Sequence, residues 1–240
     1  MTKQASRVRS SPEKARRGGL WTYAIRGAAG LLILGAIVVL SQPGALTRLQ
    51  EEFDQNVFSR GSFDTHGGVS KGDAELSTLF TPTVMYWAED IKRWALDYNL
   101  NPNVIATIIQ IESCGDPYVS SGAGAQGLFQ VMPFHFDDRE NQLSTDTNAV
   151  RGLNHMNECL QLSGYDVGVS FACYNGGASV INRPQSEWFQ ESRDYFRWGT
   201  GIYDDASNGR TESDTLAQWL AAGGSTLCNR ASETQTLFTP

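Results

Sequence analysis

Apolar residues in the middle of the chain recur at the spacing of an α-helix, and this periodicity constrains the fold more than any other feature. The pattern runs from Pro82 to Tyr98 and resumes after Asn101-Pro102, a pair typical of a helix start. It then continues to Glu112. Alternating apolar and polar residues, which mark half-buried strands, are scarce along the chain. We therefore predict a mainly α-helical domain, with further helices over 148–162, 167–175 and 215–222.

The N-terminal part of the chain carries the signature of a membrane-inserted segment. Residues 27–40 are apolar and uncharged, and the apolar stretch extends back to Leu20. Residues 1–26 carry seven lysines and arginines and a single acidic residue. A basic stub before an apolar run places the stub in the cytoplasm. We predict a cytoplasmic stub at 1–19 and a transmembrane signal anchor at 20–41, with a cleaved signal peptide as the alternative.

Composition divides the rest of the chain into three parts. Residues 42–80 are rich in Gly, Ser, Asp and Thr, which predicts a linker. Residues 81–200 hold most of the helical pattern and form the main domain. Residues 201–240 are expected to form a C-terminal helical extension. The whole chain has a net charge of −7 despite its basic start, so the remainder is strongly acidic, which argues against a nucleic-acid partner.

The cysteines and histidines indicate neither a metal site nor a cofactor. The four cysteines include no pair at CxxC spacing, and the three histidines are scattered along the chain. We expect His66, His135 and His155 to bind no metal. An even number of cysteines outside the cytoplasm is instead typical of disulfides.

Glu112 is the clearest candidate for a chemically active residue. It lies four residues after Ile108 and seven after Ile105, which places it on the apolar face of its helix. Burial and the C-terminal end of a helix both disfavour a carboxylate anion, so both raise its pKa. A neutral carboxylic acid can protonate a leaving-group oxygen. The alternative is an ordinary glutamate that points into solvent.

The loop from Gly122 to Gly127 matches the pattern GxGxxG, but its context is wrong for a dinucleotide site. No strand precedes it, and no alternation of strands and helices surrounds it. Glycines at such density allow the backbone to approach a ligand closely. The nearby Gln130 adds an amide that can both donate and accept.

Three segments, in their order and spacing, resemble the soluble lytic transglycosylase family. The resemblance covers about residues 85–200, and Asn148 and Gly152 match a further helical motif of that family. The segment 191–195 resembles another. The three segments are Glu112-Ser113, Gly127-Leu128-Phe129-Gln130 and Tyr174-Asn175.

This resemblance implies a lysozyme-like helical domain at 81–200 that acts as the lytic transglycosylase catalytic domain. Such enzymes cleave the β-1,4 bond between N-acetylmuramic acid and N-acetylglucosamine of peptidoglycan and leave a 1,6-anhydro end, without a cofactor. Glu112 would be the sole acid and base. The residues expected to bind or orient the substrate are Ser113, Gln130, Tyr174, Asn175 and Tyr195.

Two other functions remain open at this point. A muramidase would hydrolyse the same bond and would need a second carboxylate, for which Asp116, Asp137 and Asp138 are available. A non-catalytic protein could bind peptidoglycan without turnover. In each case the expected partners are peptidoglycan glycan strands and the membrane. The expected location is a bacterial cell membrane, crossed once, with the domain facing the wall.

The cysteines permit three disulfide connectivities, and one pair stands out. Cys159 and Cys173 fall at positions that look like the core faces of helices, whereas Cys114 and Cys228 fall in predicted loops. We therefore hypothesise a disulfide between Cys114 and Cys228 that holds the C-terminal segment beside the helix of Glu112.

Overall fold

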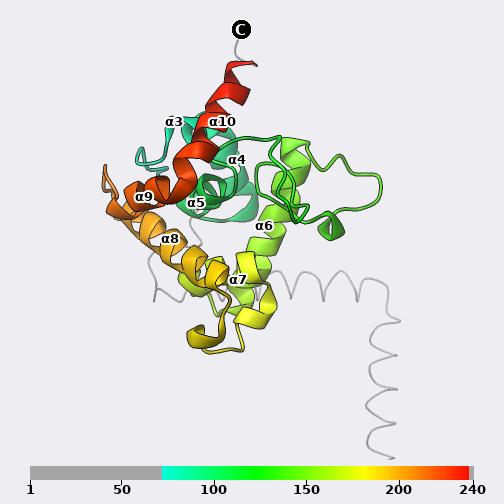
Figure 1. Ribbon diagram of the computed structural model, residues 1–240, viewed down its shortest axis with the longest axis vertical. Helices are drawn as coiled ribbons and strands as arrows, with labels where there is room; N and C mark the ends of the chain where they lie inside the picture. The colour runs from blue at the N-terminus through cyan, green and yellow to red at the C-terminus, as the bar shows by residue number, and fades with distance from the viewer. Residues whose placement is uncertain (1–71, 238–240) are drawn as a thin grey trace, which may run out of the picture. The chain divides into compact units, whose positions relative to one another are not determined.

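The computed structural model describes residues 72–237, and these residues fold into packed helices (Figure 1). Within this range no strand forms, and only two isolated β-bridges occur, both in the loop before Val131. The predicted mainly α-helical class is confirmed. The predicted stub at 1–19 and signal anchor at 20–41 lie outside the described residues. Between 72 and 237, no helix has the length and apolar character needed to cross a membrane.

The helices follow one another with short connections, apart from the long loop between Glu112 and Thr145. The α-helices are α3 (Pro82–Met85), α4 (Ala88–Tyr98), α5 (Pro102–Glu112), α6 (Thr145–Leu162), α7 (Val167–Gly176), α8 (Gln190–Ser207), α9 (Asp214–Trp219) and α10 (Ser225–Thr236). The shorter helical turns are η1 (Pro133–His135), η2 (Ala178–Val180), η3 (Gln185–Glu187) and η4 (Leu220–Gly224).

Side-chain caps explain where two of the predicted helices begin. The Asn101 side chain accepts a hydrogen bond from the backbone N of Asn103 at 2.9 Å and starts α5. Asp166 accepts one from Val169 at 2.9 Å and starts α7. The predicted helix over 82–98 is instead two helices, because Trp87 leaves helical geometry between them and donates its indole N–H to the Gly115 carbonyl at 2.9 Å.

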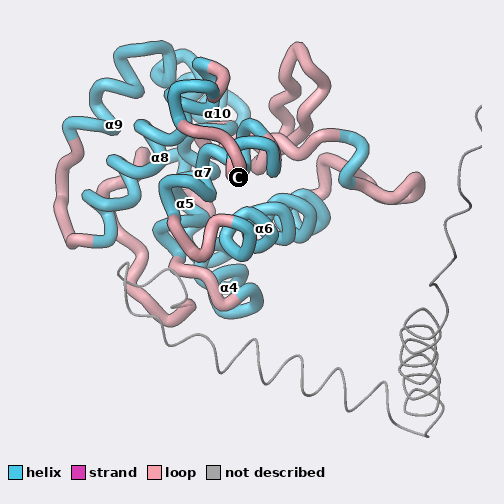
Figure 2. The backbone as a smooth tube through the Cα atoms, turned by 90° about the horizontal axis from the view of Figure 1, so that it is seen from below, coloured by secondary structure: helices cyan, strands magenta, loops and turns pink. Residues whose placement is uncertain are grey.

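Helix α5 is the centre of the hydrophobic core. It is buried from Pro102 to Gln110, and α4 and α8 both pack against it (Figure 2). A helix that is apolar on all sides is stable only when neighbours cover it completely. The largest fully buried side chains come from five helices and from the loops beside them, namely Ile91, Leu100, Ile105, Ile108, Ile109, Leu128, Phe129, Leu153, Met156, Leu160, Phe171 and Ile202.

The last part of the predicted linker belongs to the folded domain. Leu76, Leu79 and Phe80 are buried in the core. The backbone N of Ser77 donates to Asn103 Oδ1 at 2.8 Å, and Asn103 returns a hydrogen bond to a backbone carbonyl of the same segment. The boundary between 80 and 81 was therefore placed too late. The residues before 72 lie outside the described range.

The C-terminal part is also helical, but it is divided differently from the prediction. Helix α8 continues through residue 200 to Ser207, so no boundary falls at 200. The predicted stop at Gly223-Gly224 agrees with the structure, because Gly223 leaves helical geometry and the chain kinks there before a further helix, α10, begins at Ser225. Gly223 takes the irregular geometry, with φ of 130°, and Gly224 lets the backbone lie directly against the Trp219 ring.

Two disulfides join elements that are distant in the sequence. Cys114 pairs with Cys228, as the loop placement of Cys114 led us to expect, although Cys228 lies in α10 rather than in a loop. Cys159 and Cys173 form a second disulfide between α6 and α7, which sequence reasoning missed. Their positions on core faces are compatible with pairing because the two helices pack together.

The two disulfides should contribute unequally to stability. The sequence separation is 114 residues for Cys114–Cys228 and 14 for Cys159–Cys173, and a longer closed loop restricts the unfolded chain more. We expect the C114A/C228A variant to lose about 4 to 5 kcal/mol of unfolding free energy and C159A/C173A about 3 kcal/mol. Urea unfolding of both variants measures this difference. The reverse order of the two losses would contradict it.

Candidate active site

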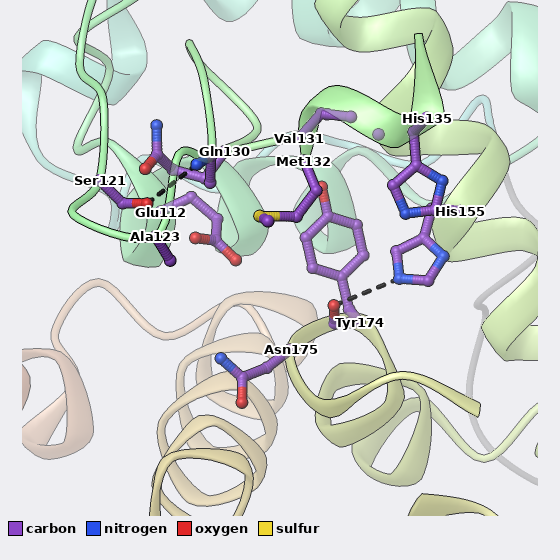
Figure 3. A pocket seen from close by; sticks show the side chains of 12 residues that line it. Glu112, Ser121, Ala123, Gln130, Val131, Met132, His135, His155, Tyr174 and Asn175 are labelled. Carbon is purple, nitrogen blue, oxygen red and sulfur yellow. Dashed lines mark hydrogen bonds between the residues drawn. The ribbon is translucent and has the colours of Figure 1, made fainter. Parts of the chain in front are cut away.

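A pocket of about 290 Å³ lies beside the C-terminal end of α5. Figure 3 shows the Glu112 carboxyl inside it, with Ser121 and Ala123 on one side and His135 and His155 on the opposite side. The other lining residues are Ala125, Gln130, Val131, Met132, Gly152, Tyr174 and Asn175. A concave site with a few polar groups among apolar ones is typical of ligand binding.

Glu112 is held in a position that favours its neutral form. It is the last residue of α5 and is half-buried, with fully buried residues on both the preceding turn and the following loop. Burial raises the pKa of its carboxyl to about 8, while the nearby Tyr195 phenol acts in the opposite direction. The carboxyl is therefore largely protonated at neutral pH, as a general acid must be.

Two buried tyrosines stand close to this carboxyl. The Tyr174 hydroxyl donates to the Phe129 carbonyl at 2.8 Å, so Tyr174 supports the loop under the pocket. The Tyr195 hydroxyl is buried and has no hydrogen-bond partner of good geometry within residues 72–237. Burial and the nearby Glu112 charge raise the pKa of both phenols, and both remain neutral. Tyr195 is not among the residues that line the pocket, and its interaction is with the Glu112 carboxyl.

One buried asparagine holds the loop that carries Gln130. The Asn148 side chain accepts from the Phe129 backbone N at 2.7 Å and donates to the carbonyls of Gln126 and Gln142 at 2.8 and 3.0 Å. It therefore fixes three points of the loop from a single position in α6. Gly152, one turn later, has no room for a side chain, because a Cβ would lie 2.7 Å from Phe129.

Ser113 serves the same loop and not the pocket. It is fully buried, and its hydroxyl donates to the Leu128 carbonyl at 2.7 Å and accepts from the Gly115 N at 3.1 Å. Ser113 is not among the residues that line the pocket, so the structure does not place it at the position expected for contact with substrate. The other expected role, orienting Glu112, fits the observed contacts because Ser113 ties the end of α5 to the loop.

Gln130 and Asn175 each present one amide group to the pocket, a hydrogen-bond acceptor from Gln130 and a donor from Asn175. The Gln130 amide nitrogen donates to the carbonyls of Val119 and Gly127 at 2.9 and 3.0 Å, which leaves its oxygen for a ligand. Asn175 accepts from Ser192 at 3.0 Å, which leaves its amide nitrogen for a ligand. One residue can accept and the other can donate.

The structure brings two histidines to the pocket that the sequence did not indicate. The ring centroids of His135 and His155 are 5.0 Å apart, and those of His155 and Tyr174 are 5.1 Å apart. The two histidines are 20 positions apart on different elements, so no spacing rule could have found them. Between 72 and 237 no group of three or more His, Cys, Asp or Glu side chains is arranged to hold a metal.

The three aspartates considered for a second carboxylate do not reach the pocket. Asp116 is buried elsewhere, and one of its oxygens lies 3.7 Å from Arg230. Asp137 is exposed and pairs with Arg151 at 2.8 Å, and Asp138 is exposed. Glu112 is the single carboxyl among the residues that line this pocket.

The fold and the pocket define a lysozyme-like helical domain built around one acid. Residues 89–196 match the family model described as the transglycosylase SLT domain. Over 113 residues the chain is 32% identical to a protein of Enterobacteria phage PRD1 named transglycosylase. The match covers 46% of this chain and 40% of that relative, so the chain spans well under two thirds of the relative's length.

We therefore identify residues 89–196 as a domain of the soluble lytic transglycosylase family. The matched segment begins in α4 and ends within α8, and it includes Glu112, the Gln130 loop, Asn148, Tyr174 and Tyr195. The expected family and the expected lysozyme-like fold are both confirmed.

The raised pKa of Glu112 has a measurable cost in stability. Between pH 4.5 and about 8 the folded protein holds a proton that the unfolded chain releases, so the wild type loses stability as pH rises through this range. We expect E112Q to unfold like the wild type below pH 4.5 and to be about 2 to 4 kcal/mol more stable near pH 8.

Denaturant titrations at several pH values test this expectation. The matched control is E89Q, which removes an exposed carboxylate that pairs with Lys92 on the surface and contributes little. A difference between E112Q and the wild type that does not change with pH would contradict the assignment of a raised pKa.

Loss of the Asn148 side chain should loosen the loop below the pocket. We expect N148A to lower the unfolding free energy by about 2 to 4 kcal/mol, because it leaves buried backbone groups without partners. The control is N154A, at an exposed position of the same helix, which should change stability by less than about 0.5 kcal/mol. Urea unfolding measures both, and equal stability of the two variants would contradict the role of Asn148.

Proposed function

We propose that this protein is a peptidoglycan lytic transglycosylase in which Glu112 acts as the sole acid and base. The observation that carries the proposal is the half-buried Glu112 carboxyl, the single carboxyl lining the pocket of an SLT domain. Its pKa, raised to about 8, keeps the proton in place for transfer to a glycosidic oxygen.

The proposed reaction begins with protonation of the bridging oxygen by Glu112. The bond between this oxygen and C1 of the muramoyl residue breaks, and the leaving sugar departs with a free 4-hydroxyl. The Glu112 carboxylate then accepts the proton of the muramoyl 6-hydroxyl, and the oxygen of this hydroxyl bonds to C1. This closes a 1,6-anhydro ring and restores the neutral acid, and no water is consumed.

The composition of the pocket supports attack by the sugar's own hydroxyl. Hydrolytic glycosidases generally pair the acid with a second carboxylate that activates water or attacks the sugar. Asp116, Asp137 and Asp138 all lie away from the pocket lining. An intramolecular hydroxyl needs no such partner, since it is already held next to C1.

The free polar groups of the pocket suit an acetylated amino sugar. An acetamido group has one N–H donor and one carbonyl acceptor. The Gln130 oxygen can accept from the N–H, and the Asn175 amide can donate to a carbonyl or hydroxyl oxygen. Tyr174 and Ser113 take part indirectly, because they hold the loop that presents Gln130.

We also propose that the domain works outside the cytoplasm of a bacterial cell, tethered to the membrane by residues 20–41. The two disulfides support an oxidising compartment. The basic stub before the apolar segment supports a cytoplasmic N-terminus. A tether of this kind would restrict the enzyme to the part of the wall nearest the membrane.

The products released from peptidoglycan test the reaction directly. The full chain in mild detergent is incubated with purified sacculi, and the soluble fragments are analysed by mass spectrometry. We expect anhydro ends, each lighter by one water than a reducing end. E112Q should release soluble fragments about 100-fold more slowly or slower still, because general acid catalysis accelerates such reactions by this factor or more. The control E89Q should match the wild type.

Two results would contradict the proposal. Reducing ends in place of anhydro ends would make the protein a muramidase. Binding of sacculi without any release by the wild type would make it a peptidoglycan-binding protein. A further check is the pH profile: the initial rate should fall as pH rises above about 8, where Glu112 loses its proton.

A further inference from the structure

Four aromatic rings follow one another from the protein surface to the tyrosine beside Glu112. The ring centroids are separated by 4.5 Å between Phe134 and His135, 5.0 Å between His135 and His155, and 5.1 Å between His155 and Tyr174. Figure 3 shows the two histidines side by side on the wall opposite Ser121. The reaction proposed above uses none of Phe134, His135 and His155.

His155, the inner histidine, has a structural role. His155 Nε2 lies 3.2 Å from the Tyr174 backbone carbonyl, which can only accept, so this nitrogen carries the proton. Its Nδ1 is buried without a hydrogen-bond partner in the described part of the chain, and the closest acidic group is Glu158 at 3.9 Å. His155 therefore supports the ring wall and offers no polar atom to a ligand.

The outer histidine is available to a ligand. His135 is half-buried and lines the pocket, and within residues 72–237 its ring nitrogens have no hydrogen-bond partner. Burial, the neighbouring His155 and the Arg151 charge lower its pKa, while Glu158 raises it by less than burial lowers it. A neutral imidazole has one donor and one acceptor, which suits sugar hydroxyl and acetamido groups.

Arg151 does not turn this wall into an anion site. Its guanidinium pairs with Asp137 at 2.8 Å and with Glu140 at 2.7 Å, so its charge is already compensated. With a neutral His135 and a compensated arginine, the wall offers no net positive charge to a carboxylate. This argues for an uncharged sugar ring as the ligand and against the acidic groups of a peptide stem.

Phe134 extends the wall beyond the pocket. Its side chain is 75% exposed, although a large aromatic ring gains free energy when it is covered. It directly precedes His135, a residue that lines the pocket, in the same helical turn, η1. The apolar face of a pyranose ring can cover such a side chain while its hydroxyls stay in contact with water or with His135.

We infer that Phe134 and His135 form an additional sugar-binding subsite at the edge of the pocket, which holds an uncharged ring of the glycan strand beyond the two sugars at the cleaved bond. The inference rests on the proposed function for the nature of the strand. In this proposal Phe134 and His135 favour long glycan strands over short ones, because only a strand that extends past the pocket can reach Phe134.

Binding of glycan strands by the full-length E112Q protein tests this subsite without cleavage. The ligands are long strands with their peptides removed by an amidase, long strands with peptides retained, and a disaccharide. We expect F134A and H135A each to raise Kd for both kinds of long strand about 3- to 10-fold. F134A should leave Kd for the disaccharide unchanged, because Phe134 is not among the residues that line the pocket.

Two further variants separate stacking from general disturbance. F189A removes a ring that is 74% exposed and that does not line the pocket, and it should bind all ligands like the parent. F134W keeps an aromatic face and should retain the affinity that F134A loses. Because Phe134 is exposed, F134A should unfold at the same temperature as the parent.

The outcomes distinguish the two proposals. If F134A binds long strands as tightly as F189A does, or if its effect appears only with peptides retained, the subsite is wrong. If the wild type releases no fragments while F134A still weakens strand binding, the subsite stands and the enzymatic proposal fails. If the parent protein binds no glycan at all, both are overturned.

Discussion

The cost of ionising one carboxyl at the end of an apolar helix underlies the organisation of this domain. Helix α5 is buried along nearly its whole length, and Glu112 closes it at the point where the chain turns into the pocket loop. A carboxylate there lacks solvation, so the residue keeps its proton up to a pH of about 8. Burial of this ionisable group costs stability at higher pH and leaves a protonated carboxyl in the pocket at neutral pH.

Two sets of contacts hold the turn after Glu112 in place. From below, Ser113 and Asn148 bind the carbonyl and amide groups of the Gln130 loop. From the other side, α10 reaches the same turn through the disulfide at Cys114 and through Gln235, whose amide nitrogen donates to the Gly115 carbonyl at 3.0 Å. The position of the acid therefore depends on residues from α6 and α10 as much as on its own helix.

Local sequence patterns predicted the helices and the acid, because both follow from neighbours within a few residues. The caps at Asn101 and Asp166 and the offset of Glu112 along the apolar stripe are of this kind. What failed required contacts between distant segments. Ser113 points inward to a loop carbonyl, and Cys159 pairs with Cys173 because α6 and α7 pack together. The histidine pair depends on how η1 meets α6, which no periodicity encodes.

The disulfide between Cys114 and Cys228 has a consequence for the order in which the active site is completed. A ribosome releases Glu112 long before Tyr174, Tyr195 and Cys228, and all three belong to its surroundings. A nascent chain that ends before these residues keeps Glu112 in contact with water, where an ordinary carboxyl is ionised. The protonated form of Glu112 is therefore favoured only after synthesis has passed α10 and the helices have closed around the residue, so that unfinished or unfolded copies carry Glu112 as an ordinary ionised carboxylate.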